Sequence, residues 1–153
     1  LSLVGSEMCI RDRGITMLLE LLQKGYGKTM NLNCAEKILY GANWAYNMQL
    51  QPQALKIAAG FGGGMGAGAA CGVVTGACMV LSTLYVKRNG KEEGCKVREL
   101  CKEFVDTFKA ETGSYDCCEV KPKYFEPEIQ CDKVVFKGAE ILDKIVAREG
   151  LRK

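Results

Sequence analysis

Apolar positions along the chain recur at the helical spacings of three and four residues. The clearest stripe covers residues 97–108, ends before the stop at Gly113, and consists of Val97, Leu100, Cys101, Phe104, Val105 and Phe108. A second stripe follows Pro127 and consists of Val134, Val135, Ala139, Leu142, Ile145 and Val146. Stripes of this period predict amphipathic helices that each bury one face.

Four shorter segments predict further helices, over residues 15–22, 33–44, 52–60 and 71–86. Asn33 and Glu36 form a capping-box pattern at the second of these, and Pro52 suits the first turn of the third. No segment alternates with period two, and residues 114–126 are predicted to be a loop. We therefore expect an all-α single domain of five or six packed helices, with a glycine-rich loop leading into a buried central helix.

The glycine-rich stretch GFGGGMGAGAACGVVTGAC covers residues 60–78, with glycine at every fourth position from Gly60 to Gly76. In a helix, small residues at this spacing form a groove that lets a neighbouring helix approach closely. A dinucleotide-type match, Gly64-x-Gly66-x-x-Ala69, lacks both the preceding strand and the acidic residue about 20 positions later. The P-loop-like Gly27-Lys28-Thr29 has Leu22 where the first glycine belongs, so no nucleotide site is expected.

The charge pattern argues against two other kinds of partner. Basic and acidic residues interleave along the chain and the net charge is +3, which does not favour nucleic-acid binding. No charge occurs between Lys56 and Lys87, but the helical part of that interval is shorter than the roughly 20 residues that span a bilayer. We therefore expect a core helix and no membrane span.

Composition narrows the chemistry to cysteine. The chain has 153 residues, the size of one domain, with nine cysteines and no histidine. Without histidine, the chain alone cannot build a Cys-His nucleophile, a mixed Cys/His zinc site or a C-x-x-C-H haem attachment. Metal ligation, redox catalysis and packing are the uses that remain for the thiols.

Residues 1–13, LSLVGSEMCIRDR, resemble the translation of a transposase sequencing adapter. We therefore leave them out of the fold prediction, with a genuine disordered leader as the alternative, and assign the domain to residues 14–153. Translation would then begin near Met17 with no visible signal peptide, so a cytoplasmic protein with reduced thiols is expected.

Four cysteines fall at or near predicted helix starts: Cys34, Cys71, Cys117 and Cys131. Cys131 is expected one turn inside the helix that Pro127 begins. Because helix N-termini stabilise anions and lower the pKa of cysteine, these thiols could converge as thiolates. Cys78 and Cys101 lie on apolar faces, where free cysteine usually behaves as a small hydrophobe.

These motifs resemble the C-GCAxxG-C-C family of redox-active proteins. The matching pieces, in the family's order, are Asn33-Cys34-Ala35-Glu36, GFGGGMG from Gly60, Cys71-Gly72-Val73-Val74-Thr75-Gly76, Gly113-Ser-Tyr-Asp-Cys117, and Cys131. Val73 departs from the family's alanine and puts tight helix packing there in question. Cys118 leaves the third cysteine open, although the spacing from Gly113 favours Cys117. The resemblance implies a small helical protein with redox activity and a prosthetic group such as an iron-sulfur cluster.

Three uses of the four cysteines remain open. They could ligate an iron-sulfur cluster or another redox metal centre for electron transfer, assisted by backbone N–H groups of the cofactor-binding candidates Gly62, Gly63, Gly64, Gly66 and Gly72. They could hold zinc in a structural or interaction module. Two of them could instead exchange disulfides, with Cys71 as the attacking thiolate. A redox partner protein is expected, but the sequence specifies neither its identity nor the oligomeric state.

Overall fold

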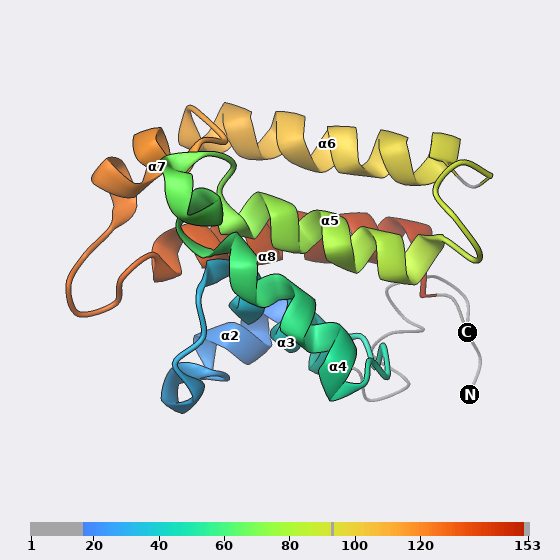
Figure 1. Ribbon diagram of the computed structural model, residues 1–153, viewed down its shortest axis with the longest axis horizontal. Helices are drawn as coiled ribbons and strands as arrows, with labels where there is room; N and C mark the ends of the chain where they lie inside the picture. Colours follow the sequence, from blue (N-terminus) through green and yellow to red (C-terminus); the bar gives the residue numbers. More distant parts are fainter. Residues whose placement is uncertain (1–16, 93, 152–153) are drawn as a thin grey trace.

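The computed structural model describes residues 17–92 and 94–151 and consists of helices packed in one domain (Figure 1). The helices are α2 (Leu18–Gln23), α3 (Cys34–Ala45), α4 (Pro52–Leu55), α5 (Gly72–Tyr85), α6 (Gly94–Thr112), α7 (Cys117–Tyr124) and α8 (Asp132–Glu149). Within the described residues, the only β-pairing consists of two isolated bridges. The predicted all-α fold is confirmed, whereas the predictions for residues 1–13, and for a first helix beginning at Ile15, lie outside the described residues.

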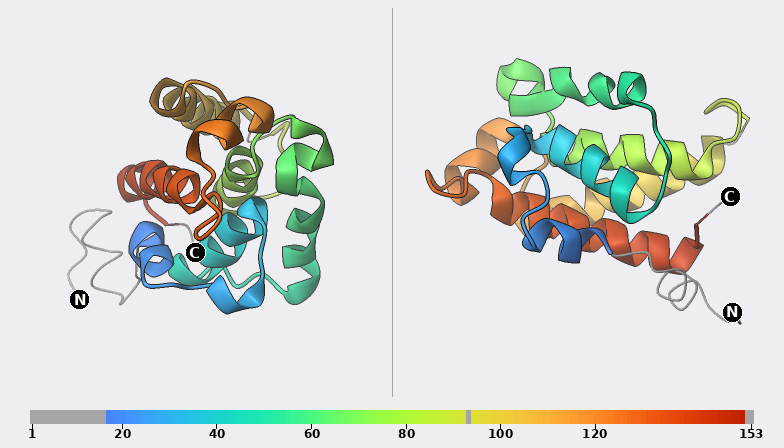
Figure 2. Two further views of the ribbon diagram at one scale, coloured as in Figure 1. Left: turned by 90° about the vertical axis from the view of Figure 1, so that its left-hand side faces the viewer. Right: turned by 90° about the horizontal axis from the view of Figure 1, so that it is seen from below.

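Helix α5 is the centre of the domain. It packs against α3, α6 and α8, which surround it when the bundle is viewed along its length (Figure 2). Val73, Val80 and Leu81 on α5 are fully buried. The buried central helix that the sequence predicts is therefore present.

Glycines set the closeness of α5 to α3. A Cβ atom added at Gly72 would lie 2.9 Å from the backbone nitrogen of Ala35, and one at Gly76 would lie 2.9 Å from the Ala35 carbonyl oxygen. These positions confirm the predicted groove. The rest of the four-residue glycine series does not continue it, because Gly60 lies in a short 3₁₀ segment (Lys56–Phe61) and Gly64 and Gly68 bound a π-type turn (Gly64–Gly68).

Val73 does not prevent tight packing. It is fully buried, and a Cβ atom added at Gly138 of α8 would overlap its Cγ1 atom. The space that an alanine would leave at position 73 is thus filled by valine against a glycine on the facing helix. The sequence prediction took account of position 73 on α5 but not of the glycine that faces it on α8.

Two boundaries differ from the prediction. The final helix begins at Asp132, five residues after Pro127, because residues 126–130 form a turn in which the Glu126 N–H bonds to the Gln130 carbonyl at 3.0 Å. The predicted loop over residues 114–126 contains α7, which tolerates Pro122 in its interior. Cys131 is therefore the N-cap of α8 and does not lie one turn inside it, and Cys117 is the first residue of α7.

The predicted stripes of α6 and α8 face the core. In α6, Val97, Leu100, Phe104 and Phe108 are buried, and Cys101 and Val105 are half-buried; all six apolar positions predicted for α8 are buried. No helix among the described residues has the length and apolar character needed to cross a membrane.

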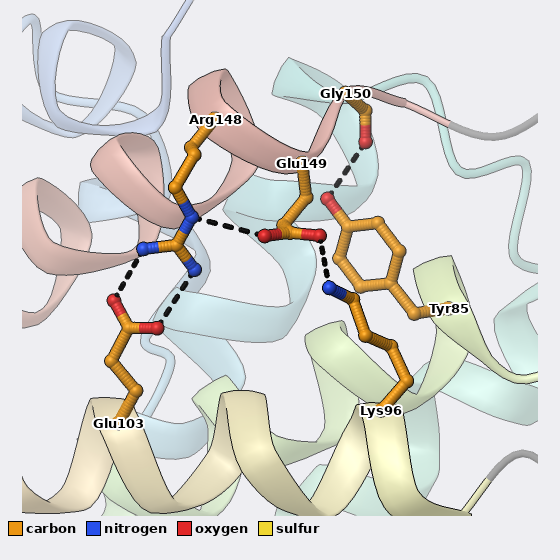
Figure 3. Close-up of polar contacts among 6 residues, drawn as sticks. All are labelled: Tyr85, Lys96, Glu103, Arg148, Glu149 and Gly150. Carbon is orange, nitrogen blue, oxygen red and sulfur yellow. Dashed lines mark hydrogen bonds and ion pairs between the residues drawn. The ribbon is translucent and has the colours of Figure 1, made fainter.

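Hydrogen bonds and ion pairs connect α5 and α6 to the C-terminal end of α8 (Figure 3). Arg148 donates hydrogen bonds of 2.8 and 2.7 Å to the Glu103 carboxylate, and Lys96 pairs with Glu149 at 2.7 Å. The Tyr85 hydroxyl donates to the Gly150 carbonyl at 2.8 Å. These contacts tie α5 and α6 to the C-terminal end of α8, and the helix N-termini of α5 and α8 meet near α7 (left in Figure 1).

Candidate functional site

Four cysteines that are far apart in sequence line one pocket of about 260 Å³: Cys34, Cys71, Cys117 and Cys131. Each lies at a helix start, since Cys34 and Cys117 are the first residues of α3 and α7 and the other two are the N-caps of α5 and α8. The N-termini of four helices therefore lie at this pocket. These are the same four cysteines that the sequence singles out as ligand candidates.

A capping box fixes the position of Cys34. The Asn33 side chain accepts from the Glu36 N–H at 2.9 Å, and the Glu36 carboxylate accepts from the Asn33 N–H at 2.9 Å. The Asn33 amide also donates to the Ala59 carbonyl at 3.0 Å, and a Cβ atom at Gly62 would meet the Asn33 side chain at 2.7 Å. The glycine-rich segment is thus packed against the cap that presents Cys34.

A short antiparallel pairing brings Cys71 to Cys117. The Cys71 N–H donates to the Tyr115 carbonyl at 2.7 Å, and the Cys117 N–H donates to the Ala69 carbonyl at 2.6 Å. Gly64 has positive φ, and a Cβ atom there would lie 2.8 Å from the Cys117 Cβ. The glycine-rich turn is therefore a close-packed support for this pairing.

Cys117, and not its neighbour Cys118, lines the cysteine pocket. Cys118 is exposed and lines a more open hollow beside it, against Gly68. Cys71 is 5% exposed, whereas Cys34, Cys117 and Cys131 are half-buried. The geometry favours the spacing argument for Cys117 as the third cysteine.

The five glycines singled out as cofactor-binding candidates divide into three groups. Gly63 and Gly72 line the pocket. Gly62 and Gly64 stand behind it, against Asn33 and Cys117. Gly66 does not line the pocket, and a Cβ atom there would have no neighbour within 4 Å.

Cys34 and Cys131 line the same pocket and act on each other's pKa. Donation to Cys131, together with burial, raises the pKa of Cys34 well above its usual value. That hydrogen bond lowers the pKa of Cys131 to about 7, with further lowering from the cations of Lys121 and Lys37. The first thiol of this pair to ionise is therefore Cys131.

The other two pocket cysteines favour the thiol form. Burial raises the pKa of Cys71 to about 11, although the backbone N–H groups of Val73 and Val74 lower it. Burial, followed by the charge of Cys131, raises the pKa of Cys117. The helix start acts on Cys71 as predicted but is outweighed by burial, so Cys131 is the more acidic thiol.

Two lysines of this site were missed by the sequence reasoning. Lys37 lies one turn after Cys34 and pairs with Asp132 at 2.8 Å, and Lys121 lies one turn after Cys117 with its ammonium 5.1 Å from the centre of the Phe125 ring. Both line the pocket. The spacing of three or four residues after each cysteine was a signal that could have found them.

The contact between Cys78 and Cys101 was also missed. Each acts on the pKa of the other, from α5 and α6 respectively, and both are half-buried. Sequence alone treated each as an isolated apolar residue. Nothing in the sequence relates a position in the middle of one helix to a position in the next.

A single metal ion requires at least three ligands that approach one point, at about 2.3 Å for thiolates around zinc. Among residues 17–92 and 94–151, no three cysteine or carboxylate side chains are gathered in that way. The four cysteines line one pocket, but no three of them form a group that could hold one metal ion.

The fold and the pocket define an all-α, cysteine-rich protein in which four dispersed thiols meet at clustered helix starts. Residues 32–145 match the model of the family described as "Putative redox-active protein (C_GCAxxG_C_C)", and the chain belongs to this family. The resemblance inferred from the sequence motifs is thereby confirmed. Comparison with curated proteins and with solved structures gave no match.

Proposed function

We propose that the pocket is a thiol-disulfide redox centre in which Cys131 attacks and Cys34 resolves. The observation that carries this proposal is that Cys34 and Cys131 line one pocket, where the influence of Cys34 lowers the pKa of Cys131 to about 7. A thiol whose pKa lies near ambient pH is the most effective attacking group, because it combines a substantial thiolate fraction with retained nucleophilicity. Cys131 is also half-buried, which leaves it accessible to a disulfide.

The exchange balances with a low-molecular-weight disulfide as the oxidant. The Cys131 thiolate attacks one sulfur of the substrate, forms a mixed disulfide and releases the first thiolate, which takes a proton from water. Cys34 then loses its proton, attacks the Cys131 sulfur and releases the second thiol. The substrate disulfide gains two electrons and two protons, and the protein is left with a Cys34–Cys131 disulfide.

Trapping of the mixed disulfide tests the order of attack. With 2-hydroxyethyl disulfide at pH 7, the unmodified protein is expected to link the tryptic peptides 29–37 and 124–133, each of which contains one cysteine. Cys34→Ser is expected to keep a stable mercaptoethanol adduct on peptide 124–133, because the resolving thiol is absent. Mass spectrometry of non-reduced, alkylated digests detects both products.

Cys118→Ser is the matched control, because Cys118 is a cysteine of the same region that does not line the pocket. This variant should form the 29–37 to 124–133 link as the unmodified protein does. Adduct formation on Cys71 in preference to Cys131 would restore the assignment made from the sequence and contradict this proposal.

A second function, ligation of an iron-sulfur cluster, is favoured by a separate observation: four thiols line one pocket. Such clusters bind four cysteines through more than one iron atom, so the sulfurs need not converge on a point. The thiol donors are therefore of the right kind and number, whereas their spacing does not fit a single zinc ion. Cys34, Cys71, Cys117 and Cys131 would hold the cluster, which would supply one-electron transfer.

Anaerobic incubation with ferrous iron and sulfide separates the two functions. A bound cluster gives broad visible absorbance with stoichiometric iron and sulfide, which Cys71→Ser should abolish and Cys118→Ser should retain. Two results would contradict this second function. One is the absence of visible absorbance from the unmodified protein, and the other is a full cluster signal in Cys71→Ser. Zinc found in the purified protein at one equivalent would support the structural alternative.

A further inference from the structure

A second cavity of about 480 Å³, here called the side hollow, lies beside the cysteine pocket. It is formed between the glycine-rich turn (Gly64–Gly68) and α7, which are in contact at one end of the domain (Figure 1). The two cavities have four lining residues in common: Gly63, Cys117, Lys121 and Phe125. A molecule held in the side hollow would therefore lie next to the thiols of the pocket.

The walls of the side hollow are apolar apart from one positive charge. Phe125 is 42% exposed, and the Lys121 ammonium lies 5.1 Å from the centre of its ring. Lys121 is the only charged side chain among the described residues that line the side hollow. The cysteine pocket adds Lys37, which is paired with Asp132 at 2.8 Å, and neither cavity has a carboxylate among its described lining residues.

We infer that the side hollow binds the body of a carboxylate-bearing, low-molecular-weight disulfide, with the carboxylate at Lys121 and the carbon chain against Phe125. This inference rests on the thiol-disulfide function proposed for the pocket and adds a substrate class to it. A carboxylate meets a cation here and no like charge, whereas a cationic disulfide would meet only repulsion. The volume lies within the range of small-molecule sites, about 300–1,000 Å³.

Gly63 keeps the boundary between the two cavities open. It has a φ of +62°, and a Cβ atom added there would have no neighbour within 4 Å. Because asparagine tolerates positive φ better than most residues, Gly63→Asn adds a side chain at the boundary with little backbone strain. Gly66 has a φ of +72° and equally open surroundings but lines neither cavity, so Gly66→Asn is the matched control.

Cys118 provides a reporter thiol that is separate from Cys34 and Cys131, because it is exposed and lines the side hollow. In a Cys117→Ser background, Cys118 is the one cysteine of the tryptic peptide 110–123. The Cys118 thiol loses its proton to water and attacks one sulfur of 3,3′-dithiodipropionate. The S–S bond of the probe breaks, and its other half leaves as a thiolate that takes up a proton. Mass spectrometry of the adduct on this peptide over time gives the rate.

This rate should saturate as the concentration of 3,3′-dithiodipropionate rises. The neutral 2-hydroxyethyl disulfide and the cationic cystamine should not saturate over the same range. Lys121→Met should raise the half-saturating concentration of 3,3′-dithiodipropionate by about threefold, the size expected for one exposed ion pair. Gly63→Asn should raise it at least as much, because the side chain takes up space at the boundary. Lys109→Met is the control for charge, since the Lys109 ammonium also lies over an aromatic ring, 5.5 Å from the centre of Tyr115, but outside both cavities.

Three outcomes would overturn the inference. They are a rate that stays linear in 3,3′-dithiodipropionate, a half-saturating concentration unchanged in Lys121→Met, and an equal increase in Lys109→Met. The pocket is tested separately by linkage of peptides 29–37 and 124–133 with the same probe in the unmodified protein. Absence of that link, with the Cys118 rates as expected, would remove the redox function of the pocket and leave the side hollow as an anion-selective binding site.

Discussion

The Cys34–Cys131 pair and the Cys78–Cys101 pair have the same kind of thiol–thiol interaction but different surroundings. Cys34 and Cys131 meet where α3 and α8 begin, beside the cations of Lys37 and Lys121. Cys78 and Cys101 lie in the interiors of α5 and α6, and their pKa values are set by each other and by burial. In both pairs one thiol donates and the other accepts, so the pKa of the donor rises and that of the acceptor falls.

The comparison separates the effect of contact from the effect of location. A hydrogen bond from a neighbouring thiol suffices to lower the pKa of Cys101. Only in the pocket is the lowering aided by nearby lysines, and there the pKa of Cys131 reaches about 7. We therefore expect the pocket pair to react first at neutral pH, before Cys78 and Cys101.

The largest expected effect comes from separating α3 and α5 at the pocket. In Gly72→Ala the new methyl group would lie 2.9 Å from the Ala35 nitrogen and 3.2 Å from the Cys34 Cβ. Overpacking against backbone should lower the free energy of unfolding by about 1–3 kcal/mol, partly offset by up to about 1 kcal/mol of helix propensity. Chemical denaturation measures the loss, and alkylation of Cys131 reports the displaced Cys34 contact.

Two other glycines of the same four-residue series are matched controls. Gly76→Ala meets the Ala35 carbonyl at 2.9 Å and should destabilise similarly while leaving the reactivity of Cys131 unchanged. Gly60→Ala has no neighbour within 4 Å and should change stability by less than about 0.5 kcal/mol. Equal reactivity of Cys131 in all three variants would show that Gly72 does not position the pocket pair.

The sequence predicted the helices and much of the pocket because those signals are local. The capping box at Asn33, the stripes of α6 and α8, and the glycine groove at Gly72 and Gly76 depend on contacts within a helix or on its nearest partner. The four pocket cysteines were found because each lies near a helix start and matches a family motif. The cytoplasmic location and the redox partner expected from the sequence remain predictions.

What the sequence could not provide depends on contacts between distant segments. The pairing of Ala70 with Asp116 joins Cys71 to Cys117 across residues with no shared pattern. The acidity of Cys131 depends on the distant Cys34, and burial of Cys71 reverses the expected effect of its helix start. Local rules therefore located the thiols, whereas their relative acidity depends on burial and on contacts between segments, so the role of Cys71 as the attacking thiolate stays a prediction.

Removing the donor thiol of each pair gives the next largest effect. Cys34→Ala should raise the pKa of Cys131 from about 7 towards its usual value, which lowers the thiolate fraction at pH 7. The remaining thiolate is more nucleophilic, so alkylation of Cys131 should slow by about fivefold to tenfold. Alkylation of peptide 124–133 over time, followed by mass spectrometry, measures the rate.

The matched variant outside the pocket is Cys78→Ala, which removes the thiol that acts on Cys101. Because the contact on Cys101 is not reinforced by a lysine, its alkylation should slow by less than about threefold. A larger loss at Cys101 than at Cys131 would reverse the comparison, because the neighbouring thiol would then lower the pKa of Cys101 more than that of Cys131.

The smallest expected effect isolates the contribution of charge. Lys121→Met keeps the aliphatic side chain against Phe125 but removes a cation that favours the Cys131 thiolate, so the pKa of Cys131 should rise. The midpoint of the alkylation profile of Cys131 against pH should move above about 7, with about a twofold slower reaction at pH 7. Lys102→Met, which breaks an exposed ion pair on α6, is the control.

Because Lys121 is exposed, the difference from the unmodified protein should shrink as salt increases. An unchanged midpoint at low salt, together with a shifted midpoint in Cys34→Ala, would assign the acidity of Cys131 to the thiol contact alone and remove the lysine from the comparison.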